Sequence, residues 1–326
     1  MKKHLAVLCV ILTTLTARGQ QVHTITYPDG KIRFEYHTKN GLFDGTFISY
    51  YEDGNKKAEG KFFANQRKGH WKVWDQKGQK RAERVYENTF DYRITGQWDS
   101  AGNKCKVRQS ANKKYSTVDP AFGYVPYYPI TAKEVLWSKR LWREIPADSL
   151  VNQPLFGDNR LFHKIMDAIN AHEIAAYRDE EYQQVITYDS VQEYKDYDVA
   201  FYRIKEDYFY NKTLNLSEYR TIGIGPSVKK SGKTKTLFWL YYPEMRGWLA
   251  QQQPETKTSN SLVTYESLIF NRYYNSTIYK ESNVYDREIK DYKKGKDIIK
   301  EAEMIELIAI DNEFEWWYKN TTPSKK

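Results

Sequence analysis

The chain has 326 residues, a net charge of +9 and many aromatic residues, including 28 tyrosines and 9 tryptophans. This length suggests two domains rather than one. Beyond residue 20 no stretch approaches 18 consecutive apolar residues, so the sequence predicts no transmembrane helix.

The first 20 residues have the layout of a secretory signal peptide. A basic start, MKKH, precedes the apolar run LAVLCVILTTL and the small residues around Ala17 and Gly19. Lipidation at Cys9 is an alternative, but Leu8 stands where a lipobox requires a small residue. We therefore expect an exported protein that starts near Gln20 or Gln21. Only Cys105 then remains, so no intramolecular disulfide is expected and the fold must depend on its core.

The positive charge belongs to the first half of the exported chain. Residues 21–130 contain 19 Lys and Arg against 12 Asp and Glu, whereas residues 131–326 contain 29 against 30. Export argues against nucleic acid as a partner. This leaves anionic lipid headgroups, peptidoglycan or other glycans, an acidic protein surface, or simply a solvated basic face.

A repeat of 24 residues runs through residues 21–106. Its markers are Gly30, Gly54, Gly78 and Gly102. The dipeptides Asp29-Gly30 and Asp53-Gly54 are typical of type I′ hairpin turns, because glycine accepts positive φ at no steric cost. Gly45 and Gly69 would mark the return turns. The period predicts an all-β ribbon of stacked hairpins, none of which could bury its face alone.

These repeats resemble the MORN-variant repeats of YwqK-type proteins, which serve as interaction surfaces in their families. Trp71, Trp74 and Trp98 are candidates for a glycan or lipid platform, and the alternative is that they form the core of the ribbon.

The pattern dissolves in residues 107–130, which we expect to be a linker with few apolar contacts. Residues 131–320 predict an α+β domain, followed by a disordered tail at 321–326. Its expected helices are residues 132–143, 160–172, a short one through Trp248, one capped by Thr264, and 297–310. Its expected strands are residues 199–204, 219–225 and 237–242. The predicted fold class is therefore mixed: an all-β repeat ribbon followed by an α+β domain, with the second half able to fold without the repeats.

Residues 279–292, YKESNVYDREIKDY, carry enough charged groups to suggest a catalytic cluster. Helical spacing offers another interpretation. Ser282 or Asn283 would cap a helix whose surface carries Asp286 paired with Lys290 and Arg287 paired with Asp291. We expect this amphipathic helix, and Asp286 and Arg287 are candidates for a partner contact.

Several segments appear in a characteristic order: VLWSKRLWREI, NQPLF, RIKEDYFYNK, RTIGIGP, LFWLYYPEMR, YKESNVYDREIKDY and EFEWWY. Together they resemble the gliding-motility family GldN, called PorN in non-gliding relatives, over about residues 131–318. The resemblance implies a component of the type IX secretion system of Bacteroidetes. Such a component lies on the periplasmic side of the outer membrane and forms a multimeric ring with a GldK-like (PorK-like) lipoprotein. The repeat module departs from this family, so a specialised paralogue stays possible beside a core ring subunit.

No constellation of catalytic residues emerges. The histidines lack ligand spacing, and Cys105 lacks a setting that would activate its thiol. We therefore expect no catalytic, cofactor-binding or metal-binding residues and no cofactor. Three functions stay open: a structural subunit of the secretion machinery, a periplasmic adaptor whose basic repeats bind peptidoglycan, lipid headgroups or glycan, and a hydrolase with an unrecognised site.

Overall fold

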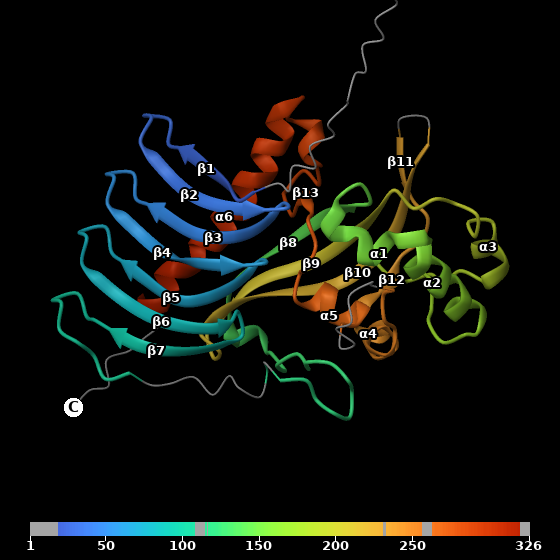
Figure 1. Ribbon diagram of the computed structural model, residues 1–326, viewed down its shortest axis with the longest axis horizontal. Coiled ribbons are helices and arrows are strands. Elements are labelled where there is room, and N and C mark those ends of the chain that lie inside the picture. Colours follow the sequence, from blue (N-terminus) through green and yellow to red (C-terminus); the bar gives the residue numbers. More distant parts are fainter. Residues whose placement is uncertain (1–18, 108–114, 116, 231–232, 256–262, 320–326) are drawn as a thin grey trace, which may run out of the picture.

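The computed structural model describes residues 19–107, 115, 117–230, 233–255 and 263–319. Two sheets stand side by side with one long helix between them (Figure 1). The expected signal peptide and C-terminal tail lie almost wholly outside the described residues. Within these residues, no helix has both the length and the apolar character needed to cross a membrane.

The first sheet is a seven-stranded antiparallel meander in which each strand pairs with its neighbours in sequence. Its strands are β1 (Gln21–Thr26), β2 (Ile32–Lys39), β3 (Leu42–Tyr50), β4 (Lys56–Phe63), β5 (Gln66–Trp74), β6 (Lys80–Asn88) and β7 (Asp91–Gln97). The predicted ribbon of stacked hairpins is thereby confirmed.

The four repeat glycines lie at the hairpin turns at one end of this sheet. Each has positive φ, from 76° at Gly78 to 94° at Gly54. The turn is not the expected type I′, because Asp29 and Asp53 keep negative φ. Gly30 N–H donates to Tyr27 O, and Tyr27 N–H donates to Lys31 O. This is a type I turn followed by a left-handed glycine, which three-residue hairpin loops favour.

The return turns lie elsewhere than predicted. Gly45 and Gly69 sit inside β3 and β5. The chain instead reverses at Asn40-Gly41 and at Ala64-Asn65, where both residues have positive φ, as a type I′ turn requires. The spacing of 24 is correct for these glycines, but their place in the hairpin is not.

The second half contains a mixed domain, as predicted for its fold class. Its sheet has the order β11-β10-β9-β8-β13. The strands are β8 (Val135–Pro146), β9 (Phe201–Asn211), β10 (Leu216–Lys230), β11 (Lys233–Thr236), β12 (Leu240–Tyr241) and β13 (Thr277–Glu281). The helices are α1 (Gln153–Phe156), α2 (Arg160–Asn170), α3 (Tyr188–Gln192), α4 (Tyr242–Gln251), α5 (Tyr265–Phe270) and α6 (Lys296–Lys319).

The helix predicted at residues 132–143 is wrong. Apart from a short 3₁₀ turn at Ala132–Glu134, this segment is β8, which is paired with β9 on one side and β13 on the other. Leu141, Arg143 and Ile145 alternate toward the interior, all at most 2% exposed. Pairing on both edges overrides a spacing of apolar residues that fits either structure.

Most other expected elements of this half are found. Residues 199–204 and 219–225 fall largely in β9 and β10, and the expected helix at 160–172 is α2. Thr264 caps α5 by accepting a hydrogen bond from Ser267 N–H. Pro243 lies in the first turn of α4, so the strand expected through residue 242 is reduced to β12.

The amphipathic helix predicted within residues 279–292 is also wrong. β13 ends at Glu281, and only Ile289–Asp291 forms a 3₁₀ turn. Asn283 does not cap a helix; its Oδ1 accepts from Tyr285 N–H and Arg287 N–H, both at 3.1 Å. Such side-chain bonds give the backbone an alternative to the helix. Of the predicted ion pairs neither forms, since Asp286 binds Lys280 at 2.6 Å and Lys290 binds Glu288.

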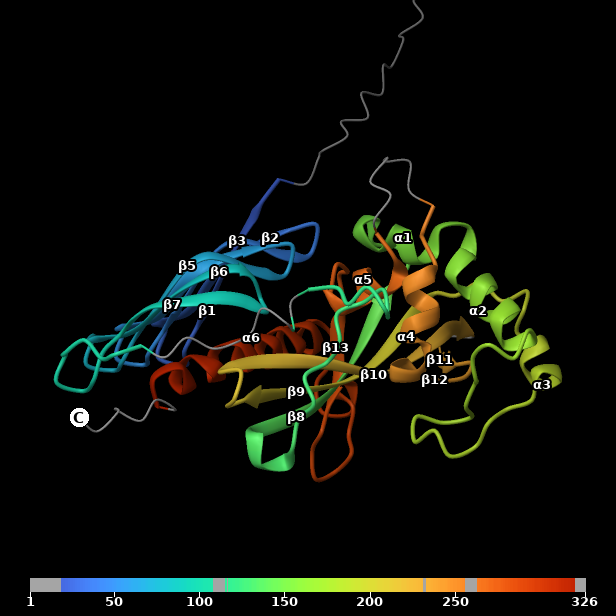
Figure 2. The ribbon, with the colours of Figure 1, turned by 90° about the horizontal axis from the view of Figure 1, so that it is seen from below.

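The long helix α6 lies between the two sheets (Figure 2). Ala302, Ile305 and Ala309 pack on the second sheet with Leu141 and Tyr208. A second apolar stripe of α6 faces the repeat sheet, at Leu307, Ile310, Phe314 and Trp317. The helix therefore belongs to the cores of both halves.

The contact between α6 and the repeat sheet is aromatic. Trp71, fully buried, stacks on Phe314 at a ring separation of 5.7 Å and meets Trp317 edge-on at 6.4 Å. Its ring also covers Gly60 so closely that a Cβ there would lie 2.0 Å from it. This leaves no room for any other residue at position 60 without repacking.

The expected linker also has more contacts than predicted. The Arg246 guanidinium lies 4.2 Å from the ring of Tyr124 and 4.3 Å from that of Tyr127, and it donates to Val125 O at 2.7 Å. Tyr115 and Tyr128 pack against the core shared by the repeats and α6. These contacts and α6 together argue against a second half that folds without residues 21–106.

This shared core makes a testable prediction. Phe314→Ala should destabilise the protein by about 3–5 kcal/mol, because a fully buried aromatic side chain is removed. Hydrogen exchange should increase in β3–β5 and in β8–β9 alike. Phe63→Ala, at a position 66% exposed on the repeat sheet, is the matched control and should change little. Faster exchange confined to the repeat sheet would mean that the two halves are separate folding units.

Candidate functional site

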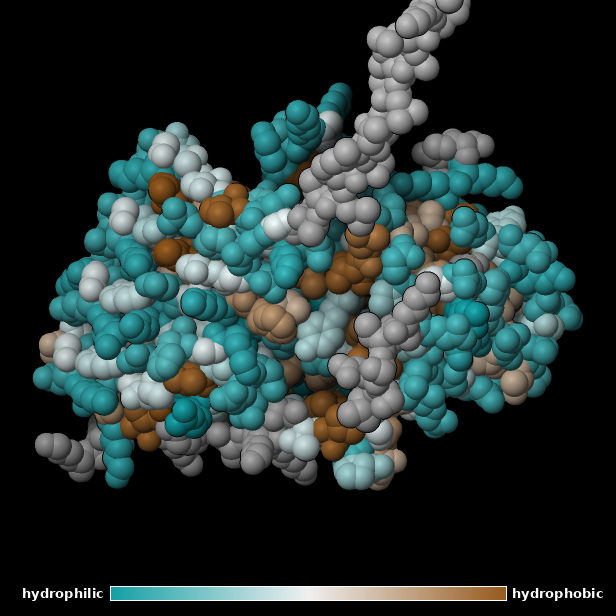
Figure 3. All heavy atoms as spheres, viewed as in Figure 1, coloured by the Kyte–Doolittle hydropathy of each residue, from teal (hydrophilic) through white to brown (hydrophobic). Residues whose placement is uncertain are grey.

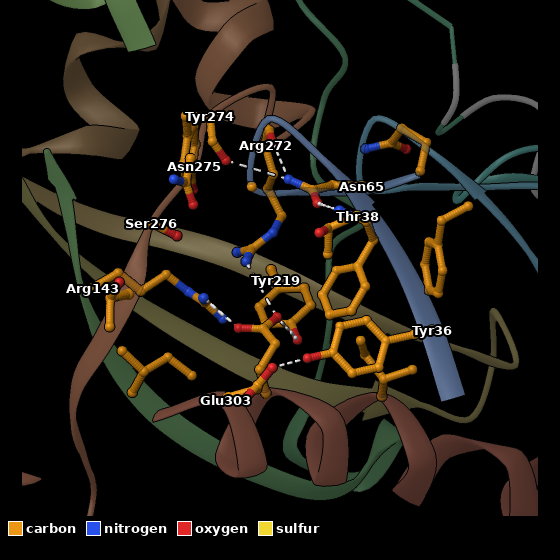
Figure 4. A pocket seen from close by; sticks show the side chains of 18 of the residues that line it. Tyr36, Thr38, Asn65, Arg143, Tyr219, Arg272, Tyr274, Asn275, Ser276 and Glu303 are labelled. Carbon is orange, nitrogen blue, oxygen red and sulfur yellow. Dashed lines mark hydrogen bonds and ion pairs between the residues drawn. The ribbon is translucent and has the colours of Figure 1, made fainter. Parts of the chain in front are cut away.

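A pocket of about 350 Å³ lies where the repeat sheet, α6 and the segment from α5 to β13 meet. Figure 4 shows side chains from all three parts converging on it, with Arg143, Arg272 and Tyr36 extending toward its centre. The surrounding surface is mostly hydrophilic, and its hydrophobic side chains occur in small separate groups (Figure 3).

Four charged side chains form a buried cluster at the base of the pocket. Arg143 from β8 pairs through Nε with Glu206 from β9 and through Nη1 with Glu306 from α6. Arg272, which follows α5, pairs with the other oxygen of Glu206 at 2.7 Å. Arg143 is 2% exposed and Glu206 is fully buried. The two cations and two anions neutralise one another, as buried charges require.

This cluster controls the ionisation of Glu306. Burial alone would raise the pKa of Glu306, but the Coulomb attraction of Arg143 and Arg272 outweighs it and holds the pKa below its ordinary value. Burial disfavours the charged form of Arg143, and the same carboxylates more than offset it, so the pKa of Arg143 is raised further. At neutral pH Glu306 and Arg143 are therefore both ionised.

A second buried pair connects the repeat sheet to α6. Arg67 from β5 lies 3.2 Å from Glu313, which also accepts a hydrogen bond from Trp317 Nε1 at 2.9 Å. The Arg67 guanidinium is surrounded by the rings of Phe62, Trp71, Tyr86 and Phe314, all within 6 Å of its centre. Positive charge over aromatic faces is favourable in a desolvated site.

Polar contacts fasten the rim of the pocket. The Asn65 amide at the β4–β5 turn donates to Arg272 O at 2.8 Å, and that of Gln66 donates to Asn271 O at 2.6 Å. On the opposite side the Tyr36 hydroxyl donates to the Glu303 carboxyl, whose pKa is raised by burial. Both halves of the chain therefore contribute to the pocket, and these hydrogen bonds fix the position of its rim.

The arrangement is that of a structural ion cluster beside a cavity. In its lining, Thr38 Oγ1 lies 2.8 Å from His23 Nε2, a contact between the neighbouring strands β2 and β1. Among the described residues there is no group of three or more His, Cys, Asp or Glu side chains that could hold a metal ion. Chemically, the site can bind a group by shape and hydrogen bonds.

The residues singled out from sequence lie elsewhere. Trp71 is fully buried in the core. Trp74 and Trp98 are half-buried on the outer face of the repeat sheet, where lysines of the same sheet cover them: Lys56 at 5.6 Å and Lys80 at 4.3 Å from the ring centres. Those lysines in turn pair with Glu59 and Glu83.

Asp286 and Arg287 lie in the exposed loop after β13. Arg287 stacks on Tyr285 at 4.5 Å, and the tip of the loop presents Val284 and Tyr285, which are 93% and 71% exposed. This loop is far more accessible than the tryptophans.

The cluster around Arg143 was not predicted from the sequence. Its members come from four elements, with 63 residues between Arg143 and Glu206 and 66 between Glu206 and Arg272. One local signal exists, since Arg143 stands at an inward position between the apolar residues Leu141 and Ile145. Because residues 132–143 were predicted to form a helix, this signal was not recognised.

Comparison with known proteins gives one result for function. The family described as gliding motility associated protein GldN matches residues 130–318. No match is found among curated proteins. The matched region contains β8–β13 and α1–α6 almost to the end of α6.

Removal of one carboxylate from the ion cluster should show its electrostatic role. Glu306→Gln leaves Arg143 and Arg272 with a single anion, so the free energy of unfolding at neutral pH should fall by about 3–5 kcal/mol. Glu52→Gln, at an exposed turn, is the control.

The pH dependence has a definite sign. Because the folded-state pKa of Glu306 lies below its ordinary value, the stabilisation is present above about pH 4.5 and is lost as the pH falls through the lower pKa. Urea unfolding at several pH values should therefore show a steeper acid loss in the wild type than in Glu306→Gln. Parallel curves for the two proteins would contradict this role of the cluster.

Proposed function

Because this chain belongs to the GldN family of gliding motility associated proteins, we propose that it is a non-enzymatic structural component of the type IX secretion and gliding machinery. The observation that carries the proposal is the extent of the match. It spans residues 130–318 and so includes both the second sheet and α6, the helix that packs on the inner face of the repeat sheet. The family domain and the repeat module therefore share a hydrophobic core.

The proposed place of action is the periplasmic side of the outer membrane, with a GldK-like lipoprotein as partner in a multimeric ring. The family and the signal-peptide layout of residues 1–20 support this location and partner. The mutual neutralisation of the charged groups at the pocket supports a structural role that needs no cofactor. The MORN-like repeats would then contribute to assembly as part of the same rigid unit.

The loop after β13 is the contact surface that we propose for this partner. Asn283 stabilises the loop by accepting hydrogen bonds from two backbone N–H groups, and the Lys280–Asp286 ion pair connects the loop to β13. It thus presents Val284, Tyr285 and Arg287 in one conformation, so little ordering entropy is lost on binding. Exposed tyrosine and arginine are among the residues that most often dominate the energy of an interface.

A pull-down from the native bacterium tests both parts of the proposal. The tagged protein should enrich a GldK-like lipoprotein, and the combined change Val284→Asp with Tyr285→Ala should reduce that enrichment about tenfold. Phe63→Ala removes an equally exposed aromatic residue from the repeat sheet and should leave the enrichment unchanged. If the wild-type protein recovers no secretion component at all, the proposed function is wrong. If only the loop variant behaves as wild type, the contact lies elsewhere.

A second candidate function is an adaptor that binds an anionic polymer such as peptidoglycan, or anionic lipid headgroups. It is favoured by Lys61, Lys72 and Arg93, which are exposed between inward-facing neighbours on β4, β5 and β7. No ion pair to these three is found in the part of the chain that the structure describes. They lie on the outer face of the sheet, where Lys72 stands opposite Glu59 and Glu83 of the neighbouring strands.

Co-sedimentation separates this candidate from the first. Bound fractions with purified sacculi or anionic vesicles should fall several-fold when Lys61, Lys72 and Arg93 are all changed to Gln, and should fall as salt is raised. A control that changes Lys56, Lys80 and Lys68, all paired with glutamates, should lose less. The adaptor is excluded if neither surface retains the wild-type protein at low salt.

A further inference from the structure

We propose that the pocket between the repeat sheet and α6 binds an uncharged peptide-like ligand, in which a large apolar side chain is carried beside an amide group. This goes beyond a structural role in secretion, because it gives the protein a recognition site of its own. The proposal rests on the donors, the charge balance, the walls and the opening of the pocket.

The first support is a set of buried polar groups without partners. Arg143 Nη2, Arg67 Nε and the Tyr274 hydroxyl have no hydrogen-bond partner, although each belongs to a side chain at most 5% exposed that lines the pocket. Buried donors are nearly always satisfied in native proteins, and leaving one unpaired costs about 1–3 kcal/mol. A ligand with oxygen acceptors could satisfy these donors.

Charge balance determines the kind of acceptor. The arginines at the pocket are already compensated, Arg143 and Arg272 by Glu206 and Glu306, and Arg67 by Glu313; the lining also includes the Glu303 carboxyl, whose pKa is raised by burial. An ionised ligand would add an uncompensated charge to a buried site, which is costly. A neutral carbonyl oxygen satisfies the arginine and tyrosine donors without that cost.

The walls and size select a large apolar group. Ring and aliphatic side chains from both halves line the cavity, namely Phe43, Phe62, Phe90, Phe270, Ile278 and Ile310. A volume of about 350 Å³ is within the range of small-molecule sites. An aromatic or long aliphatic side chain can fill it.

The opening suits an extended chain. Gln21, Thr277 and Ile299 line the pocket and are exposed to solvent, so a ligand can enter beside them. Gln21 and Thr277 belong to β1 and β13, the end strands of the two sheets. End strands have free backbone groups with which an extended peptide can pair.

Three probes that share a phenyl side chain and differ in charge test the ligand class: neutral N-acetylphenylalaninamide, anionic N-acetylphenylalanine and cationic 2-phenylethylamine. With the full chain and ligand-observed NMR, the neutral amide should bind at millimolar concentration, about tenfold more tightly than either charged probe. Equal or tighter binding of the carboxylate or the amine would overturn the proposal, and tighter binding of the amine would point to Glu303 instead. The absence of binding by all three probes at about 10 mM would also overturn the proposal, because it would mean that water alone fills the pocket.

Substitutions locate the binding. Tyr274→Phe removes a donor without changing the volume of the pocket and should weaken amide binding about fivefold. Tyr202→Phe is its matched control, because Tyr202 is equally buried with an unpartnered hydroxyl but does not line the pocket. Thr277→Trp, at an exposed strand position, should block the opening and abolish binding without affecting the melting temperature. If Tyr274→Phe and Thr277→Trp both bind as wild type, the ligand is not in this pocket.

Discussion

The fold depends on the burial of two faces of a single helix. With 3.6 residues per turn, α6 presents one apolar stripe through Ala302, Ile305 and Ala309 to the second sheet, and another through Leu307, Phe314 and Trp317 to the repeat sheet. The aromatic rings on the repeat strands are covered by α6 and, around the β9–β10 turn, by Tyr210, Leu214 and Leu216. The contact of Trp71 with Phe314 and Trp317 therefore joins what the sequence presents as two domains.

Buried charges give this junction its specificity. Apolar stripes would tolerate a shift of the helix along its axis, whereas Glu306 and Glu313 each have to meet an arginine. Glu306 meets Arg143 and Arg272, and Glu313 meets Arg67, about two turns further along the helix. A displacement of α6 by a single turn would leave buried ions unpaired. The same requirement keeps the pocket open, since the arginines are held at its base rather than collapsed into it.

Local patterns in the sequence were sufficient for the repeat sheet and for several helices. The glycine period is a signal that repeats every 24 residues, so the hairpins could be predicted from it. The turn type and the positions of the return turns could not. The capping of α5 by Thr264 was equally local. By contrast, β8 is a strand because β9 and β13 pair with it, and the loop after β13 is held by the Asn283 amide rather than by helical bonds.

The pocket could not be predicted for a related reason. Its arginines and glutamates are brought together from β8, β9, the end of α5 and α6, and no spacing in the sequence announces them. The tryptophans that attracted notice are either core residues or are covered by lysines of their own sheet. In this chain the conspicuous residues are structural, and the residues with spare bonding capacity are inconspicuous.

The position of α6 in the chain has a consequence for the time at which the protein matures. A polypeptide that emerges N-terminus first would complete all thirteen strands before the residues that cover them become available. Until Trp317 has appeared, the aromatic inner face of the repeat sheet stays exposed and prone to aggregation. The last step of folding is thus postponed until nearly the whole described chain is present. Any factor that holds the chain unfolded has to act over that entire interval.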